Sequence, residues 1–112
     1  MSYVIVFRSR LRPGVEEEYG RRGDEIYGLA EKMPGLLSVK DFTAEDGERV
    51  SIVEFDTEAN LLAWREHAEH RRAQAQGRET FYEGYSIQIC KVERSATFDR
   101  QAGTWEQRPT RW

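Results

Sequence analysis

Cysteine, histidine and proline are scarce in this chain of 112 residues, which has one, two and three of them. The lone Cys90 forms no disulfide within its own chain, and the first residues lack the basic segment and apolar run of a secretory signal, so we expect a cytoplasmic protein. With only His67 and His70, and no H-E-x-x-H spacing, the sequence does not favour a metal site. No glycine-rich loop of the kind that holds a nucleotide or flavin follows a strand, so we expect no cofactor.

Long hydrophobic runs are also missing. Hydrophobic residues make up 38% of the chain and charged residues 33%, a balance that fits neither a disordered nor a membrane-spanning protein. The formal net charge of -3 repels a phosphate backbone, and residues 48–55 (ERVSIVEF) lack the glycine and aromatic pattern with which RNA-recognition modules stack on bases. We therefore expect neither nucleic acid nor a membrane as partner.

The apolar patterns predict one α+β domain over residues 1–93, with the element order βαββαβ. Asp46 and Gly47 suit a tight hairpin turn between the second and third strands. Thr57 suits the N-terminal cap of a single second helix, and Gly77 suits its end. The expected strands cover residues 3–11, 36–44, 48–56 and 85–92, and the expected helices cover residues 15–33 and 58–76.

Three glycines interrupt the first expected helix, namely Gly20, Gly23 and Gly28. Each costs about 1 kcal/mol of helix stability relative to alanine. Close packing against a neighbouring element, or a pliable segment, would explain them.

This element order is typical of a ferredoxin-like, four-stranded antiparallel sheet with strands one and three in the centre and both helices on one face. Val50 and Ile52 share one side of the third strand, and Val53 and Phe55 share the other, so the face without helices would be apolar and exposed in a monomer. We therefore expect a homodimer in which two such faces pair and form an α+β barrel.

The tail, residues 94–112, is polar but contains Trp105 and Trp112. Because tryptophan is costly to leave in water, we expect the tail to pack on the domain or on its dimer partner. The alternative to a homodimer is that this tail covers the apolar sheet face within one chain.

Trp64, His67, His70 and Gln74 recur at helical spacing on the second helix. An indole beside imidazoles offers a flat apolar surface together with groups that titrate near neutrality, which suits binding a planar phenol and removing its proton. The same spacing also fits a tryptophan packed in the core and histidines on a solvated flank. Both interpretations stay open at this point.

The sequence resembles the antibiotic biosynthesis monooxygenase (ABM) domains of the dimeric α+β barrel superfamily. The likeness covers roughly residues 3–92 and is carried by FRSRLRPG at residues 7–14, by the Pro34–Gly35 turn, and by the run from VEFDTEANLLAWREHAEH to SIQIC at residues 53–90. The resemblance implies a ferredoxin-like fold, a homodimer and, for part of the family, oxidation of an anthrone or quinol by molecular oxygen without flavin or metal.

The resemblance also implies roles for particular residues. Family oxygenases commonly have a tryptophan on the second helix, matched by Trp64, and an asparagine on the first strand, where Ser9 stands. His67 or His70 would be the base, and Trp64 would pack on the substrate ring. Gln74 stands near the place of the iron-binding histidine of the haem-degrading branch. The expected substrate-binding residues are Ser9, Gln74, Arg78 and Tyr82. A non-enzymatic dimeric ligand-binding or interaction module and a haem-binding or haem-degrading protein are the alternative functions.

Overall fold

The structure is a computed structural model that describes residues 2–100, 104 and 105. Its main strands are β1 (Tyr3–Leu11), β2 (Leu36–Thr43), β3 (Arg49–Phe55) and β4 (Tyr82–Lys91). Its helices are α1 (Glu16–Ala30), α2 (Glu58–Glu66) and α3 (Ala68–Gln76), and a π-helical turn (Gly77–Phe81) joins α3 to β4.

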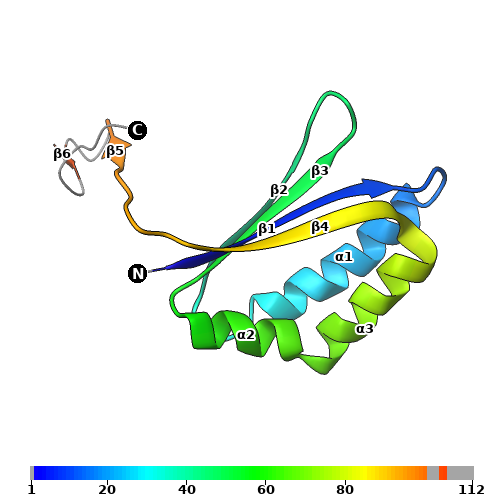
Figure 1. The fold of residues 1–112 in the computed structure, drawn as a ribbon, viewed down its shortest axis with the longest axis horizontal. Helices are drawn as coiled ribbons and strands as arrows, with labels where there is room; N and C mark the ends of the chain where they lie inside the picture. The colour runs from blue at the N-terminus through cyan, green and yellow to red at the C-terminus, as the bar shows by residue number, and fades with distance from the viewer. Residues whose placement is uncertain (1, 101–103, 106–112) are drawn as a thin grey trace.

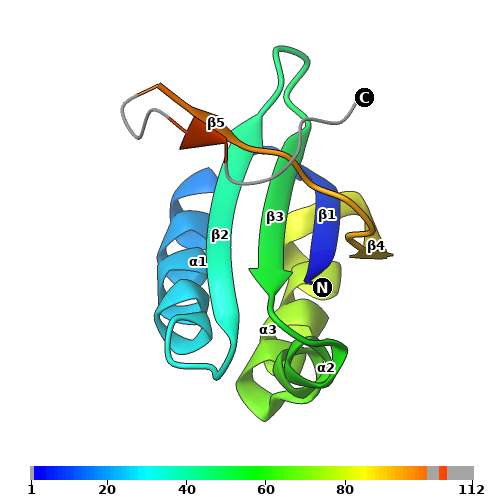
Figure 2. The same ribbon diagram turned by 90° about the vertical axis from the view of Figure 1, so that its left-hand side faces the viewer.

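The four main strands form one antiparallel sheet in the order β2-β3-β1-β4, so the predicted fold class and the predicted central strands are confirmed. All three helices cover one face of this sheet (Figures 1 and 2). The hairpin between β2 and β3 turns at the predicted place, where Gly47 has a φ of +93° and Asp46 accepts a hydrogen bond from the amide of Glu48.

The prediction of one continuous second helix is wrong, because the chain breaks at His67 into α2 and α3. His67 has an extended ψ of 129°, and its Nδ1 accepts a hydrogen bond of 3.2 Å from the amide of Glu69. It therefore caps a new helix, whose first amides have no partner within the helix. The predicted cap is confirmed at Thr57, which accepts from the amide of Asn60, and α3 ends immediately before Gly77.

Close packing does not explain the glycines of α1. A Cβ at Gly20, Gly23 or Gly28 would have no neighbouring atom within 4 Å. Gly23 is half-buried and lies between Tyr19 and Ile26 on the helix face turned towards the sheet. The missing side chain at Gly23 thus leaves open space beneath the sheet.

The core lies between the sheet and α2, with Phe55 and Leu61 fully buried and Trp64 exposed by only 3%. The interpretation of Trp64 as a packed core residue therefore holds. Burial of Phe55 at the end of β3 and of Leu61 and Trp64 on α2 fixes that helix against the sheet, since each contributes about 1.5–3 kcal/mol of apolar burial.

The opposite face of the sheet has no helix. Val6 pairs with Ile52 and Phe42 pairs with Val50, so these apolar side chains lie together on it. Ile52 and Phe42 are 37% and 48% exposed. The predicted apolar, uncovered sheet face is confirmed; we call it the open face and define it by Val6, Phe42, Val50 and Ile52.

The tail leaves the end of β4, and its described residues 98–100, 104 and 105 lie apart from the main sheet and the helices (Figure 1). There β5 (Phe98–Asp99) pairs with β6 (Thr104–Trp105). Trp112 lies outside the described residues. Packing of the tail on the domain or on a partner stays a prediction.

None of the helices in the described part of the chain has the length and apolar character needed to cross a membrane.

Gly35 is a glycine that the fold requires. Its φ is +81°, and a Cβ there would collide with the side chains of Asp56 and Asn60. We expect Gly35→Ala to lower the free energy of unfolding by at least about 1–2 kcal/mol. Gly28→Ala is the control, because it lies in a helix with open space around it and should raise stability by up to about 1 kcal/mol. Urea unfolding of both variants measures the difference, and equal effects would contradict the assignment.

Candidate functional site

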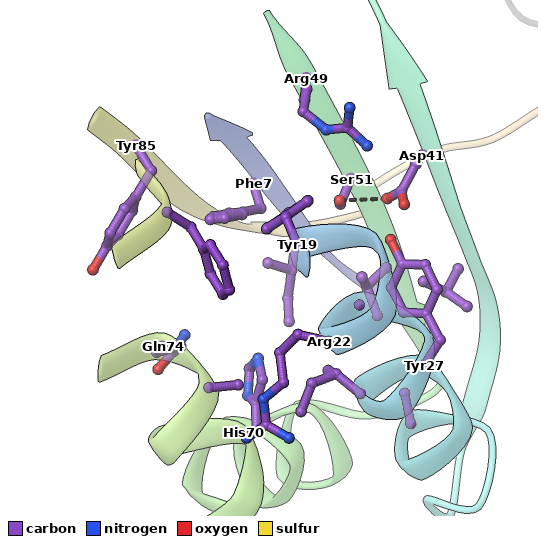
Figure 3. Close-up of a pocket in the computed structure, with 18 of the residues that line it drawn as sticks. Phe7, Tyr19, Arg22, Tyr27, Asp41, Arg49, Ser51, His70, Gln74 and Tyr85 are labelled. Atoms are coloured by element: carbon purple, nitrogen blue, oxygen red, sulfur yellow. Dashed lines mark hydrogen bonds between the residues drawn. The ribbon is translucent and has the colours of Figure 1, made fainter. Parts of the chain in front are cut away.

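A cavity of about 250 Å³ lies between the sheet and the helices. A cavity of about 150 Å³ already holds benzene, so this one has room for a larger ring compound. Side chains from β1, β2, β3, β4, α1, α2, α3 and the π-helical turn line it. Figure 3 shows that it has an aromatic wall and two separate polar ends.

The aromatic wall consists of Phe7, Tyr19, Tyr82 and Tyr85, whose rings meet edge to face at centroid distances of 5.3–5.6 Å. The hydroxyl of Tyr82 donates to that of Tyr19 at 3.0 Å. Burial, and then the neighbouring Tyr19, raise the pKa of Tyr82 well above its ordinary value of 10. The wall is therefore uncharged at neutral pH and suits an apolar ring.

His70 forms the first polar end. Its imidazole stacks on the indole of Trp64 with centroids 4.2 Å apart, and its Nδ1 lies 3.2 Å from the carbonyl oxygen of Trp64. A carbonyl only accepts, so Nδ1 carries the proton and Nε2 keeps its lone pair. Burial lowers the pKa of His70 to about 4, and the positive charge of Arg65 contributes in the same direction. His70 is therefore a neutral proton acceptor at pH 7.

The break at His67 makes this arrangement possible. In a continuous helix the carbonyl of Trp64 would accept from the amide four residues on, that of Ala68. Here it accepts from the amide of His67 at 3.1 Å and has a second lone pair for His70. The helix break thus fixes both the orientation and the tautomer of the imidazole.

Tyr27, Asp41 and Ser51 form the second polar end, on the other side of the cavity from His70 and Gln74 (Figure 3). Ser51 donates its hydroxyl proton to the carboxylate of Asp41 at 2.5 Å. The hydroxyl of Tyr27 points towards the same pair (Figure 3), and burial followed by hydrogen bonding to Asp41 raises the pKa of Tyr27.

The structure brings together four of the seven residues predicted for the site: Trp64, His70, Gln74 and Tyr82 all line the cavity. The other three do not. His67 is half-buried at the helix junction, Ser9 is buried on β1 beyond Phe7, and Arg78 is exposed on the π-helical turn. Arg78 still touches the wall from outside, where it donates to the hydroxyl of Tyr85 at 3.2 Å.

Sequence reasoning missed the second polar end. Asp41 and Ser51 lie two residues from Val39 and Val53, on the strand side that faces the core. A polar residue in an otherwise apolar core-facing series was the available signal. Tyr27 gave no such signal, because tyrosine fits a helix face of either kind.

Among the described residues that line the cavity, His70 is of a kind that ligates haem iron. No cluster of three or more histidine, cysteine, aspartate or glutamate residues that could hold a metal ion occurs in the described ranges 2–100 and 104–105. Gln74 lines the cavity, but an amide is not among the usual axial ligands of haem iron.

The sequence matches one known family and one relative of known sequence. The sequence model of the family described as antibiotic biosynthesis monooxygenase matches residues 2–76. The uncharacterized protein YqjZ of Bacillus subtilis (strain 168) is 30% identical over 96 residues, covering 86% of this chain and 83% of that protein.

Solved structures share the fold at low sequence identity. Rv0793 from Mycobacterium tuberculosis has a TM-score of 0.76 at 16% identity and covers 87% of this chain and 100% of its own. A mutant of SnoaB, a cofactor-independent oxygenase from Streptomyces nogalater, has a TM-score of 0.73 at 10% identity, covering 84% and 95%.

The low pKa of His70 makes stability depend on pH. Between about pH 6.5, the ordinary histidine value, and about pH 4, the unfolded chain binds a proton at His70 that the folded protein does not. The contribution of His70 to the free energy of unfolding should therefore be fully present above pH 6.5, and the free energy should fall by up to about 3 kcal/mol as the pH drops to 4. Urea unfolding at a series of pH values measures this loss.

The control is His70→Asn, which keeps a donor for the carbonyl of Trp64 but does not titrate. This variant should lose less stability than the wild type over the same pH range. Equal losses in the two proteins would show that the acid sensitivity comes from other groups.

Proposed function

Because the chain belongs to the antibiotic biosynthesis monooxygenase family, we propose that it oxidises a small electron-rich aromatic compound, of the anthrone or quinol type, with molecular oxygen and without a cofactor. The observation that carries this proposal is the neutral imidazole of His70, held with a free Nε2 at an aromatic cavity. The cofactor-independent oxygenase SnoaB has the same fold and supports the class of reaction.

The proposed reaction starts with the removal of a proton from the substrate by Nε2 of His70. The stacked indole of Trp64 holds the imidazole in place, and the anion that forms beside it stabilises the imidazolium. The base thus becomes stronger as the proton moves towards it. Burial of His70 strengthens this attraction, because a buried site screens charges less than water does.

The substrate anion then gives one electron to molecular oxygen, and the two radicals combine to a peroxide anion on the ring carbon. This anion takes the proton back from the imidazolium of His70, which gives the hydroperoxide and restores the base. For an anthrone, loss of water from this hydroperoxide converts the CH2 group into a carbonyl. One oxygen atom enters the product and the other leaves as water, so no external reductant is needed. The protein supplies placement, a base and a dry surrounding.

Two other cavity residues have proposed roles. The amide of Gln74 lies one helical turn beyond His70 on α3 and offers a hydrogen bond to the oxygen of the substrate (Figure 3). The ring of Tyr82 forms part of the wall on which the substrate packs. Arg78 supports that wall through Tyr85.

The proposal includes a homodimer formed through the open face. The side chains of this face are apolar and lie on the two central strands and on β2. Pairing two such faces about a two-fold axis would remove them from water and leave both cavities on the outer, helix-covered side.

The same substitution, histidine to asparagine, at two positions tests His70 as the base. His70→Asn removes Nε2 but keeps a donor for Trp64, whereas His67→Asn keeps a good helix cap and lies outside the cavity. With a panel of anthrones and hydroquinones in an oxygen electrode, we expect His70→Asn to lower kcat at least about 100-fold and His67→Asn to change it less than about twofold. No uptake above the uncatalysed rate across the panel would overturn the proposal in favour of a binding module without turnover.

Ile52→Asp tests the dimer. A carboxylate in the centre of the paired face would be taken out of water with only Lys40 of the neighbouring strand beside it, so this variant should sediment as a monomer at low micromolar concentration while the wild type sediments as a dimer. Leu62→Asp introduces the same charge at a 45% exposed position on α2 and should leave the dimer intact. A wild-type monomer under these conditions would contradict the assembly.

A further inference from the structure

We infer that Tyr27, Asp41 and Ser51 form a specificity subsite for a neutral hydrogen-bond donor, such as a hydroxyl group, at the end of the ligand remote from His70. The inference rests on the proposed function, because it takes a ring compound in this cavity as given. The subsite specifies a second substituent, which the substrate ring would carry in addition to the group that meets His70.

The direction of the hydrogen bonds determines what this end recognises. The carboxylate of Asp41 has only lone pairs, so Ser51 donates its proton to it, and we take the hydroxyl of Tyr27, which points towards the same pair (Figure 3), to donate there as well. Each of these hydroxyls has one proton, and both protons are therefore engaged. The two hydroxyl oxygens can then offer a ligand only their lone pairs. These lone pairs accept a hydrogen bond from a donor group and repel another acceptor.

Nothing in the packing of the fold accounts for this group. Asp41 and Ser51 occupy the core-facing side of β2 and β3, where their neighbours Val39 and Val53 are apolar and belong to the core or pack against it. The pair is joined across the two strands, directly opposite in register. Ser51 is half-buried and Asp41 is exposed, so the pair lies at the open edge of the cavity that both residues line, where an entering ligand can reach it.

The charges at this end favour a neutral group. Arg49 also lines the cavity here, with its guanidinium carbon 5.3 Å from the centroid of the Tyr19 ring, and so brings a positive charge to the end that holds the negative charge of Asp41. The two charges offset each other for a ligand between them. An ammonium or a carboxylate would be attracted by one and repelled by the other, whereas a hydroxyl meets acceptors without this conflict.

The two polar ends lie apart from each other on different sides of the cavity, and the aromatic residues Phe7 and Tyr85 lie to one side of both (Figure 3). A flat ring with one hydroxyl at each end therefore matches the cavity: one hydroxyl meets Nε2 of His70, and the other meets the oxygens of Tyr27 and Ser51. A ring that lacks the second donor can still reach His70, but it leaves the subsite without a partner.

Two naphthalenes of nearly equal shape separate donor from acceptor. The compound 2,6-dihydroxynaphthalene has a donor at both ends, whereas 6-methoxy-2-naphthol keeps one hydroxyl and replaces the other with a group that only accepts. Binding is measured under anaerobic conditions by the fluorescence of the naphthol, so that turnover does not interfere. We expect the wild type to bind the diol about tenfold more tightly than the methoxy compound.

The variants Asp41→Asn and Tyr27→Phe should both abolish this preference. In the first, the amide can donate to the hydroxyls, whose protons then turn towards the ligand; in the second, one acceptor is lost. The affinity for 6-methoxy-2-naphthol should change less than about threefold in both. Asp46→Asn, which makes the same change in the β2–β3 turn outside the cavity, should keep the tenfold preference.

The outcomes distinguish the subsite from the function on which it rests. Equal binding of both naphthols to the wild type, or a preference that survives in both cavity variants, would overturn the subsite and leave the cavity and His70 in place. If neither naphthol binds, the assignment of the cavity to ring compounds fails, and the subsite fails with it.

Discussion

The hydrogen bond from Nδ1 of His70 to the carbonyl of Trp64 is the contact on which the chemistry of this cavity depends. It selects the tautomer that leaves Nε2 unprotonated, and it holds the imidazole flat against the indole. The bond exists because the chain turns at His67 and so brings His70 within reach of the second lone pair on the carbonyl of Trp64, which a continuous helix would place too far away. A small irregularity of the backbone thus controls the protonation state of the side chain that we propose as the base.

The sequence predicted most of the scaffold because its signals are local. Alternating apolar residues and a glycine at the hairpin turn specify strands and their antiparallel pairing, and two-sided apolar strands specify the centre of the sheet. The break at His67 escaped prediction for the opposite reason. Residues 58–76 are compatible with a continuous helix, and histidine is not one of the residues that usually cap a helix N-terminus.

The candidate site was predicted in part. Trp64, His70, Gln74 and Tyr82 were found because helical spacing and family resemblance both point to that stretch of chain. The opposite polar end, with Tyr27, Asp41 and Ser51, comes from three elements that are distant in sequence, and only the folded chain brings them together. His67 was predicted as a second candidate base, but its ring serves the backbone instead, since it accepts from the amide of Glu69.

The glycine at position 23 has a consequence for how this scaffold can diverge. Most other residues at this point of α1 would make the helix more stable through their higher helix propensity, and their side chains would occupy space that a ligand needs. The stability of the helix and the volume of the cavity therefore change in opposite directions at this one position. A lineage can narrow its range of ligands through one substitution that gains folding free energy, whereas widening that range again requires giving the free energy up.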